Sequence, residues 1–447
     1  MFKEIAENKN NPLRIIYKKY AKRLVKKANL EHRVVRILFK LIKIESNLKK
    51  KKKYGLISLT DYCAGNSCKS KRIFEGERIH IPELVFYKDK AYKPDRTPYF
   101  IVTPEVCIYI IDNINVLART DFLFSDNYLI HPNNFDPHIE LCTLEQFGRI
   151  KYDYSYKYAY VLESIPCIEI PKAVSLLGGG SGNYAHFITE VLPRLIIIDS
   201  HEEYSELPII IDGWIGEPIQ NILRLFNVNN RKIIYLDVWK KAYVENLILV
   251  SLPSTSPQEF RVNYDNKSDV SISKDVYTFN KNALKAVSFY SQKLFGNINT
   301  PYSGVKKVYL TRKAVFKESI QYNLRHIINE DEVIEVFKRF DFEIIDITTL
   351  SFPEQFSLFK NIKFVAAPLG AAIANIIFSK GEINILGLAA YYDGANYSYF
   401  TNMAESMGHN IRYVLGSQDT KSHENPMHRN YNINTTYLES ALNELCN

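Results

Sequence analysis

The segment GGGSGNYAHFITEVLPRL, which begins at Gly178, carries the residues whose types and spacing could do chemistry. His186, Glu190 and Arg194 follow one another at intervals of four, so a helix would place them on one stripe. A histidine one turn into a helix can act as a general base, and a neighbouring carboxylate would orient it and raise its pKa. The alternative is a core helix capped by Asn183, with His186 buried and hydrogen-bonded inside it.

The glycines before this helix follow a short apolar segment, AVSLL, which predicts a strand over residues 173–177. Ligands of open α/β sheets bind at the carboxyl ends of strands and at helix N-termini. The glycine segment therefore lies where a ligand is expected. It is not a phosphate-binding P-loop, because no Lys-Ser or Lys-Thr follows the glycines, and it does not match G-x-G-x-x-G.

Alternating strands and helices surround this segment. Strands are expected over 207–212, 232–236 and 246–250, with helices over about 184–200 and up to Phe226. Short β-branched and aromatic strands are expected between residues 55 and 170. This alternation predicts a parallel α/β unit.

A second α/β unit follows a polar stretch over residues 253–275 and a helix near 276–296. Its pattern is β-α-β-α-β-α-β, which predicts a Rossmann-like sheet. The successive segments are KKVYLTR, EDEVIEVFKRF, FEIIDI, FPEQFSLFK, KFVAAP, LGAAIANIIF and INILGL. Arg312 ends its first strand, and Arg325 precedes the next helix. Pro368 and Gly370 separate a strand from a helix, so backbone N–H groups there could approach a diphosphate.

The positive charge of the chain is concentrated at its N-terminus. Residues 1–53 contain 18 Lys and Arg against 4 Asp and Glu, and the remainder carries a net negative charge. Residues 12–45 predict one or two basic amphipathic helices, which could contact an anionic membrane surface. A solvated helix packed on the body and a nucleic-acid arm are the alternatives. No RNA-binding or zinc-finger pattern supports the last, so no nucleic-acid partner is predicted.

Six cysteines in 447 residues do not make a disulfide framework. Cys63 and Cys68 form a C-x4-C pair, which is either two ordinary thiols or part of a zinc site. The sequence shows no secretory signal and no apolar run long enough to span a membrane, so a reduced, cytoplasmic chain is expected.

The segment GNYAHFITEVLPRL resembles the N-x-x-H-x-x-x-E/D-x-L-P-R-L segment of the family 61 glycosyltransferases. VYLTR, RHIINE and LSFPEQFSLFKNIKFVAAPLGAAIANIIF are similar to the second half of that family in order and spacing. The resemblance covers about residues 170–390. It implies a GT-B fold, with two Rossmann-like domains facing a cleft, and an inverting transfer from a nucleotide sugar, usually UDP-linked, to an acceptor hydroxyl.

Several site features follow from this resemblance. The chain has no D-x-D segment, so helix N-termini and arginines would replace a metal ion at the diphosphate, and no metal or tightly bound cofactor is expected. Two positions depart from the family: Leu369 stands where a histidine is usual, and Gly387 stands near the position of a frequent glutamate. The missing histidine marks a different donor, a rearranged site or an inactive copy.

The sequence thus predicts an α/β, GT-B-like protein. Its expected parts are a basic segment (1–54), an acceptor-side domain (55–255), a donor-binding domain (276–425) and a closing helix (430–447). His186 and Glu190 are the predicted catalytic residues. The predicted donor contacts are Arg312, Arg325, Pro368, Gly370, Ala371 and Asn375, and the predicted acceptor contacts are Gly180, Gly182, Asn183 and Arg194.

The predicted function is the transfer of a sugar to a glycan or lipid-linked acceptor in bacterial capsule or lipopolysaccharide synthesis. The enzyme would work in the cytoplasm at the inner face of the membrane, which residues 12–53 would contact. The first alternative is a non-catalytic sugar- or nucleotide-binding subunit of a polysaccharide assembly. A third possibility is a transferase that carries phosphate or a polyol.

Overall fold

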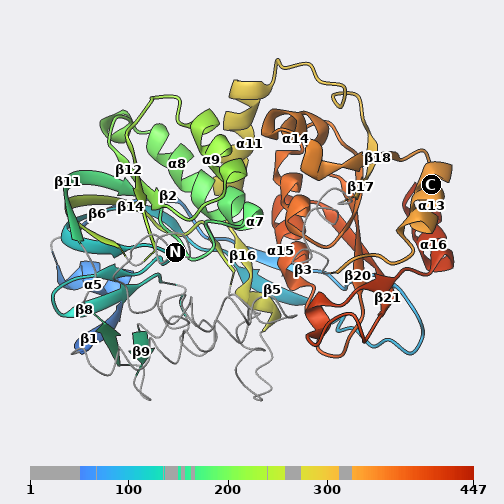
Figure 1. The fold of residues 1–447 in the computed structure, drawn as a ribbon, viewed down its shortest axis with the longest axis horizontal. Coiled ribbons are helices and arrows are strands. Elements are labelled where there is room, and N and C mark those ends of the chain that lie inside the picture. Colours follow the sequence, from blue (N-terminus) through green and yellow to red (C-terminus); the bar gives the residue numbers. More distant parts are fainter. Residues whose placement is uncertain are drawn as a thin grey trace, which may run out of the picture.

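The computed structural model describes residues 51–66, 68–133, 135, 150–152, 157–162, 167–238, 240–256, 273–311 and 325–446. The predicted basic helices and Arg312 lie outside the described residues. The described part contains two large sheets with helices packed on them (Figure 1). This confirms the predicted α/β class.

The first sheet contains eleven of the described strands. They are β1 (Lys51–Ser58), β2 (Lys69–Phe74), β6 (Val106–Leu117), β7 (Leu123–Phe124), β8 (Tyr128–His131), β9 (Ile150–Tyr152), β10 (Tyr158–Leu162), β11 (Cys167–Ser175), β12 (Ile209–Asp212), β13 (Ile233–Leu236) and β14 (Lys241–Val250). Their order is β13-β12-β11-β14-β6-β7-β8-β1-β10-β9, and β2 pairs with β6. The four strands from β13 to β14 are parallel, whereas β6 pairs antiparallel with β14. The parallel unit predicted from alternation is therefore confirmed, extended by antiparallel strands from the preceding residues.

Helices join the parallel strands of this sheet. From β11 the chain passes through α7 (Tyr184–His186), the π-helical turn η2 (Phe187–Val191) and α8 (Leu192–Asp199) to β12. From β12 it passes through α9 (Glu217–Phe226) to β13. The spatial order of the parallel strands reverses between β11 and β14, which makes that gap the topological switch point of the sheet.

The second sheet has the order β18-β17-β19-β20-β21-β22, with β4 paired to β21. Its strands are β17 (Lys307–Thr311), β18 (Glu343–Asp346), β19 (Phe364–Pro368), β20 (Asn384–Ala390), β21 (Asn410–Gln418), β22 (Tyr431–Asn432) and β4 (Phe86–Tyr87). The five strands from β18 to β21 are parallel, which confirms the predicted Rossmann-like sheet and places its switch point between β17 and β19. Strand β4 comes from the N-terminal half of the chain, and its pairing with this sheet was not predicted.

Helix α5 (Leu59–Gly65) packs on the first sheet, and the longer of the other helices surround the second sheet. They are α11 (Lys281–Phe295), α13 (Glu330–Arg339), α14 (Phe352–Phe359), the 3₁₀ helix η8 (Ala371–Phe378), α15 (Ser398–Met407) and α16 (Thr435–Cys446). The described residues also form two small two-stranded sheets. One pairs β3 (Arg78–Ile81) with β5 (Tyr99–Val102), and the other pairs β15 (Ser254–Thr255) with β16 (Thr278–Phe279). Helix α16 lies within the predicted closing segment of residues 430–447.

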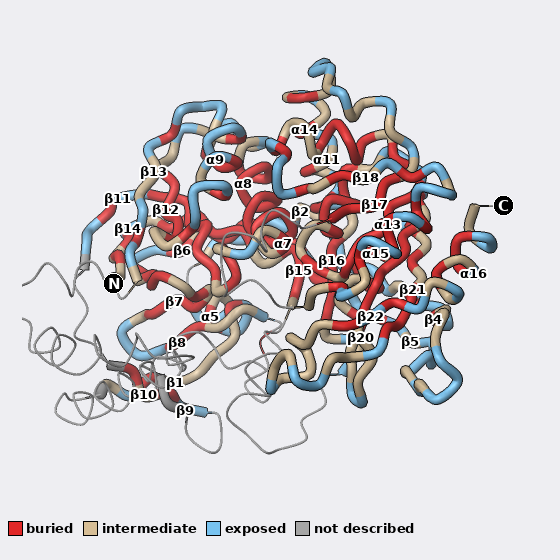
Figure 2. Tube along the Cα trace, turned by 45° about the vertical axis from the view of Figure 1, so that its right-hand side comes forward, coloured by how far each residue is buried: buried red, intermediate tan, exposed pale blue. Residues whose placement is uncertain are grey.

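One apolar core joins the two sheets. The ring of Phe226 from α9 contacts Phe295 of α11 and Phe352 of α14, with centroids 5.7 and 5.4 Å apart. These side chains are buried, and Figure 2 shows buried segments running from one sheet to the other. The two halves therefore meet through packed side chains. The GT-B arrangement and the predicted domain bounds stay predictions. No helix of the described residues is both long enough and apolar enough to cross a membrane.

Candidate active site between the two sheets

The helix that carries His186 begins and bends at identifiable residues. Asn183 caps it, because its side-chain oxygen accepts a hydrogen bond from the backbone N–H of Ala185 at 2.9 Å. Pro193 has no N–H to offer the carbonyl of Thr189, and the hydroxyl of Ser254 donates to that carbonyl instead, at 2.9 Å. A π-helical turn, a feature often found at functional sites, lies directly before α8.

The predicted pairing of His186 with Glu190 is present in the structure. Nδ1 of His186 lies 2.6 Å from Oε1 of Glu190. The hydroxyl of Ser256 lies 3.0 Å from the same nitrogen and also donates to Glu190. Because the carboxylate can only accept, Nδ1 carries the proton, and Nε2 of a neutral His186 is the free acceptor. Glu190 and Ser256 together fix the tautomer and the orientation of the ring.

Opposing effects act on the pKa of His186. Burial lowers it, whereas the charge of Glu190, the hydrogen bond to Glu190 and the charge of Asp121 raise it, and the balance is a raised pKa. The side chains of His186 and Glu190 are only 18% and 12% exposed. A base whose pKa is raised toward neutrality is suited to proton transfer near physiological pH.

His186 lies where the helices of the two sheets meet. Its ring centroid is 6.1 Å from that of Tyr399 on α15. Two residues earlier, the hydroxyl of Tyr184 lies 2.5 Å from Oδ1 of Asn375 on η8 and 3.0 Å from Oε1 of Gln355 on α14. Asn375 is fully buried in this contact. Its predicted role as a donor contact stays a prediction.

The glycine segment is held by two carboxylates that sequence reasoning missed. Asp212, at the end of β12, accepts hydrogen bonds from the N–H of Gly178 at 3.0 Å and from the hydroxyl of Ser181 at 2.7 Å. Asp121 accepts from the N–H of Gly179 at 3.3 Å. Burial raises the pKa of each carboxyl group to about 6. The backbone N–H groups of Gly178 and Gly179 are thus already bonded to carboxylates of the chain itself.

Two glycines of this segment allow close packing. A Cβ on Gly180 would lie 2.7 Å from the ring of His186, and a Cβ on Gly182 would lie 2.4 Å from the ring of Trp214. Any side chain at Gly180 would push the histidine out of place. The predicted acceptor contacts of Gly180, Gly182 and Asn183 stay predictions, whereas their packing and capping roles are visible.

Arg194 is buried behind the glycine segment. Its Nε donates to the carbonyl of Glu190 at 2.8 Å, and its terminal nitrogen donates to the carbonyl of Leu177 at 3.0 Å. It therefore ties the helix to the end of β11. Its predicted acceptor contact stays a prediction.

The predicted donor turn follows β19, at the switch point of the second sheet. Pro368 and Gly370 are buried, and Ala371 begins η8, which contacts α7. The two departures from the family pattern touch each other: a Cβ on Gly387 would lie 2.8 Å from Cδ2 of Leu369. Leucine thus occupies the space that a side chain at position 387 would need.

Arg325 is partly buried and lies beside His428 at the edge of the second sheet. It adopts a positive φ of 60°, and its N–H donates to the carbonyl of His428 at 3.2 Å. Burial, then the charges of Arg325 and His423, lower the pKa of His428 to about 4. The structure does not describe Arg312, so the predicted pair of arginines cannot be compared. No group of three or more His, Cys, Asp or Glu side chains among the described residues is placed to hold a metal ion.

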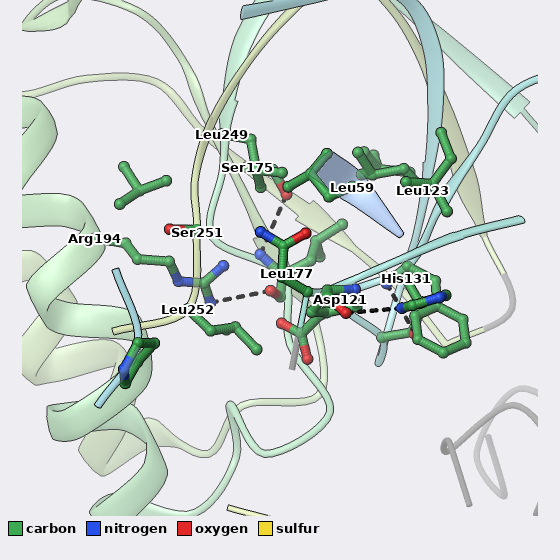
Figure 3. A pocket seen from close by; sticks show the side chains of 18 of the residues that line it. Leu59, Asp121, Leu123, His131, Ser175, Leu177, Arg194, Leu249, Ser251 and Leu252 are labelled. Carbon is green, nitrogen blue, oxygen red and sulfur yellow. Dashed lines mark hydrogen bonds between the residues drawn. The ribbon is translucent and has the colours of Figure 1, made fainter. Parts of the chain in front are cut away.

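A cavity of about 150 Å³ lies at the carboxyl ends of β11 and β14. Arg194 borders it from the helix side and His131 from the opposite side, with Asp121 and Leu177 between them (Figure 3). Sequence reasoning missed Asp121 and His131, because neither belongs to a motif near the glycine segment.

Comparison with known proteins gives one finding. Residues 184–386 match the model of a protein family described as Glycosyltransferase 61. The matched region begins at the start of α7 and ends within β20, so it contains the His186–Glu190 pair and the turn after β19. No curated protein matches the chain.

Proposed function

Because the chain belongs to the glycosyltransferase 61 family, we propose that it moves a sugar from a nucleotide-sugar donor to a glycan acceptor with inversion at the anomeric carbon. The chain is a glycosyltransferase; the donor, the acceptor and the stereochemistry are the proposed part. The observation that carries the proposal is the His186–Glu190 pair at the meeting of the two sheets.

In the proposed reaction, Nε2 of His186 takes the proton of the acceptor hydroxyl. That oxygen forms a bond to the anomeric carbon while the bond from this carbon to the nucleoside diphosphate breaks. Glu190 stabilises the imidazolium that forms, through the 2.6 Å contact at Nδ1. One base on the face opposite the leaving group is sufficient for inversion.

The donor would bind at the second sheet. A nucleoside diphosphate carries negative charge, which backbone N–H groups at the turn after β19 and arginine side chains can bind without a metal ion. Pro368, Gly370, Ala371, Arg312 and Arg325 are the proposed contacts. UDP is the favoured nucleotide because of the family resemblance.

The proposed setting is the synthesis of a bacterial surface polysaccharide at the inner face of the cell membrane. The support is the basic, amphipathic character of residues 12–53. Binding to vesicles containing anionic lipid, lost when residues 1–53 are removed or when salt is raised, would support it. Equal binding to neutral vesicles would contradict it.

Nucleotide binding and transfer test the proposal together. Calorimetry of the purified protein against UDP, GDP and CMP should show binding of one nucleotide, which Arg312→Ala weakens. His186→Ala should keep that binding and lose transfer by about 10²- to 10⁴-fold. Transfer that survives His186→Ala would rule out its role as base.

The second candidate is a non-catalytic subunit that binds a sugar or a nucleotide. It is favoured by Leu369 and Gly387, which stand where the resemblance implies a histidine and a frequent glutamate, and which lie side by side. Nucleotide binding without turnover of any nucleotide sugar, by a folded sample, would favour this candidate. Sugar transfer in any donor–acceptor pair would exclude it.

A further inference from the structure

The cavity at the switch point of the first sheet is distinct from the surroundings of His186. It is lined by Asp121, Ser175, Leu177 and Arg194 near β11, and by Leu249 and Ser251 near β14. His186 is not among its lining residues. Open α/β sheets bind ligands at this place. We propose that the cavity binds one neutral sugar unit of the acceptor, adjacent to the unit whose hydroxyl reacts; this rests on the proposed transferase function.

In the described part of the chain, the cavity has hydrogen-bond acceptors without a donor, and a ligand that donates hydrogen bonds would satisfy them. Oδ1 of Asp121 is buried and has no hydrogen-bond partner among the described residues. Nδ1 of His131 lies 2.8 Å from the carbonyl of Pro132, which can only accept, so Nδ1 carries the proton. Burial lowers the pKa of His131, so the ring is neutral and its Nε2 is a second acceptor. Sugar hydroxyls would satisfy both acceptors.

A buried polar atom without a partner destabilises the folded protein, and a hydroxyl of the ligand would offset this cost. Ser175 adds a hydroxyl to the lining, and its oxygen accepts a long hydrogen bond, at 3.4 Å, from the N–H of Leu177. The lining thus combines acceptors with a donor, as a polyhydroxylated molecule requires.

The other walls are apolar. Leu59, Phe122, Leu123, Ile130, Leu177 and Leu249 face the same space. A sugar ring presents C–H groups on its faces and hydroxyls at its edge, so it suits a site with apolar walls and a few polar groups. A volume of about 150 Å³ corresponds to about five water molecules, the scale of a single ring.

Charge argues against an anionic occupant. Asp121 lines the cavity, and Glu105 lies at its exposed rim. Arg194, the one lining arginine, donates to backbone carbonyls. The two carboxylates outnumber the single guanidinium group of Arg194, so a phosphate or carboxylate would meet a net negative charge, and the donor diphosphate is not the expected ligand.

The glycine segment links this cavity to His186. Gly178 lies against Asp121 and Arg194 on the cavity side, and Gly180 lies against the ring of His186. Only one residue separates these two glycines. The cavity and His186 therefore lie close together, next to the same short turn. Neighbouring sugar units of one glycan could occupy the two places.

Paired variants at the rim provide the test. Glu105 and Glu75 are both exposed and both pair with Arg72, at 2.8 and 3.5 Å, but only Glu105 lines the cavity. Glu105→Phe should narrow the entrance, and Glu75→Phe is the matched control. The probes are methyl glycosides of glucose, galactose, mannose and N-acetylglucosamine, with methyl glucuronide as the anionic probe, observed by saturation-transfer NMR.

We expect at least one neutral glycoside to bind the wild type and Glu75→Phe equally, and at least fivefold more weakly to Glu105→Phe and Asp121→Asn. Binding of no glycoside, stronger binding of the glucuronide, or binding that Glu105→Phe leaves unchanged would overturn the subsite. Nucleotide binding and donor turnover by the same samples report separately on the proposed function. If the protein transfers sugar but binds no glycoside in the cavity, the subsite proposal alone is wrong. If it binds glycosides but turns over no nucleotide sugar, the transferase proposal is wrong.

Discussion

Replacing Glu190 with glutamine tests whether the carboxylate tunes His186 as a base. The two groups are 2.6 Å apart and nearly buried. At an effective dielectric constant of about 20, a charge pair at about 4 Å attracts by about 4 kcal/mol, and a close pair by at least as much. Part of this attraction offsets the burial of the imidazolium. We therefore expect Glu190→Gln to cost about 2–4 kcal/mol in the transition state, or about 30- to 1,000-fold in rate.

The pH profile gives the sharper result. His186 must be neutral to accept a proton, so activity rises as the pH passes its pKa. Glu190→Gln removes the two largest effects that raise this pKa and leaves the burial that lowers it. The acid limb of kcat/KM should therefore move to lower pH while the maximal rate falls.

The assay is release of nucleotide from the donor that calorimetry identifies, followed between pH 5 and pH 9. Glu203→Gln, an exposed carboxylate on the short helix after α8, is the control and should change neither the rate nor the profile. An acid limb that stays in place or moves to higher pH in Glu190→Gln would refute the assignment of His186 as the base.

Three further predictions concern packing and pH-dependent stability. Gly182→Ala should lower the free energy of unfolding, measured in urea, by about 1–3 kcal/mol, because the added Cβ would overlap the ring of Trp214. Gly304→Ala, where no atom lies within 4 Å of the added carbon, should cost far less, and equal losses would contradict this. Gly387→Ala should also destabilise the protein, and Leu369→Ala in the same chain should recover part of the loss; a double-mutant cycle with no coupling energy would show that the two positions are independent. Burial raises the pKa of Asp212 to about 6 from 3.8, so its contribution to stability is complete below pH 4 and is lost as the pH rises through 6, by about 3 kcal/mol. The difference in unfolding free energy between the wild type and Asp212→Asn should change by this amount between pH 4 and pH 7, and a constant difference would contradict it.

The second half of the fold was predictable because its strands are short apolar runs separated by amphipathic helices. The segment KFVAAP became β19 over Phe364–Pro368, and EDEVIEVFKR became α13 over Glu330–Arg339. In such segments local propensity and burial agree, so the pattern identifies each element. Pairing between distant strands leaves no such signal. Strand β4 has only two residues, and its partner β21 follows more than 300 residues later.

At the candidate site, too, contacts within one element were predictable and contacts between distant segments were not. The spacing of His186 and Glu190 on one helix predicted their contact, because neighbours at i and i+4 face each other. Ser256, which bonds to both, is 66 and 70 residues further along the chain. Asp121 and Asp212 each resemble the ordinary polar residue that ends a strand. Only their burial beside the glycine segment separates them from such residues.

The hydrogen bonds of the glycine segment indicate which sheet is suited to the donor and which to the acceptor. A glycine turn after a strand is a common phosphate site because its N–H groups point outward to an anion. Here the N–H groups of Gly178 and Gly179 point to Asp212 and Asp121, so a phosphate at those two amides would have to displace a carboxylate. The turn instead allows the ring of His186 to pack closely against Gly180. A site that holds a base and repels phosphate suits a neutral acceptor, and the charged donor is then expected at the opposite sheet, where Arg325 and the turn after β19 provide positive charge and N–H groups.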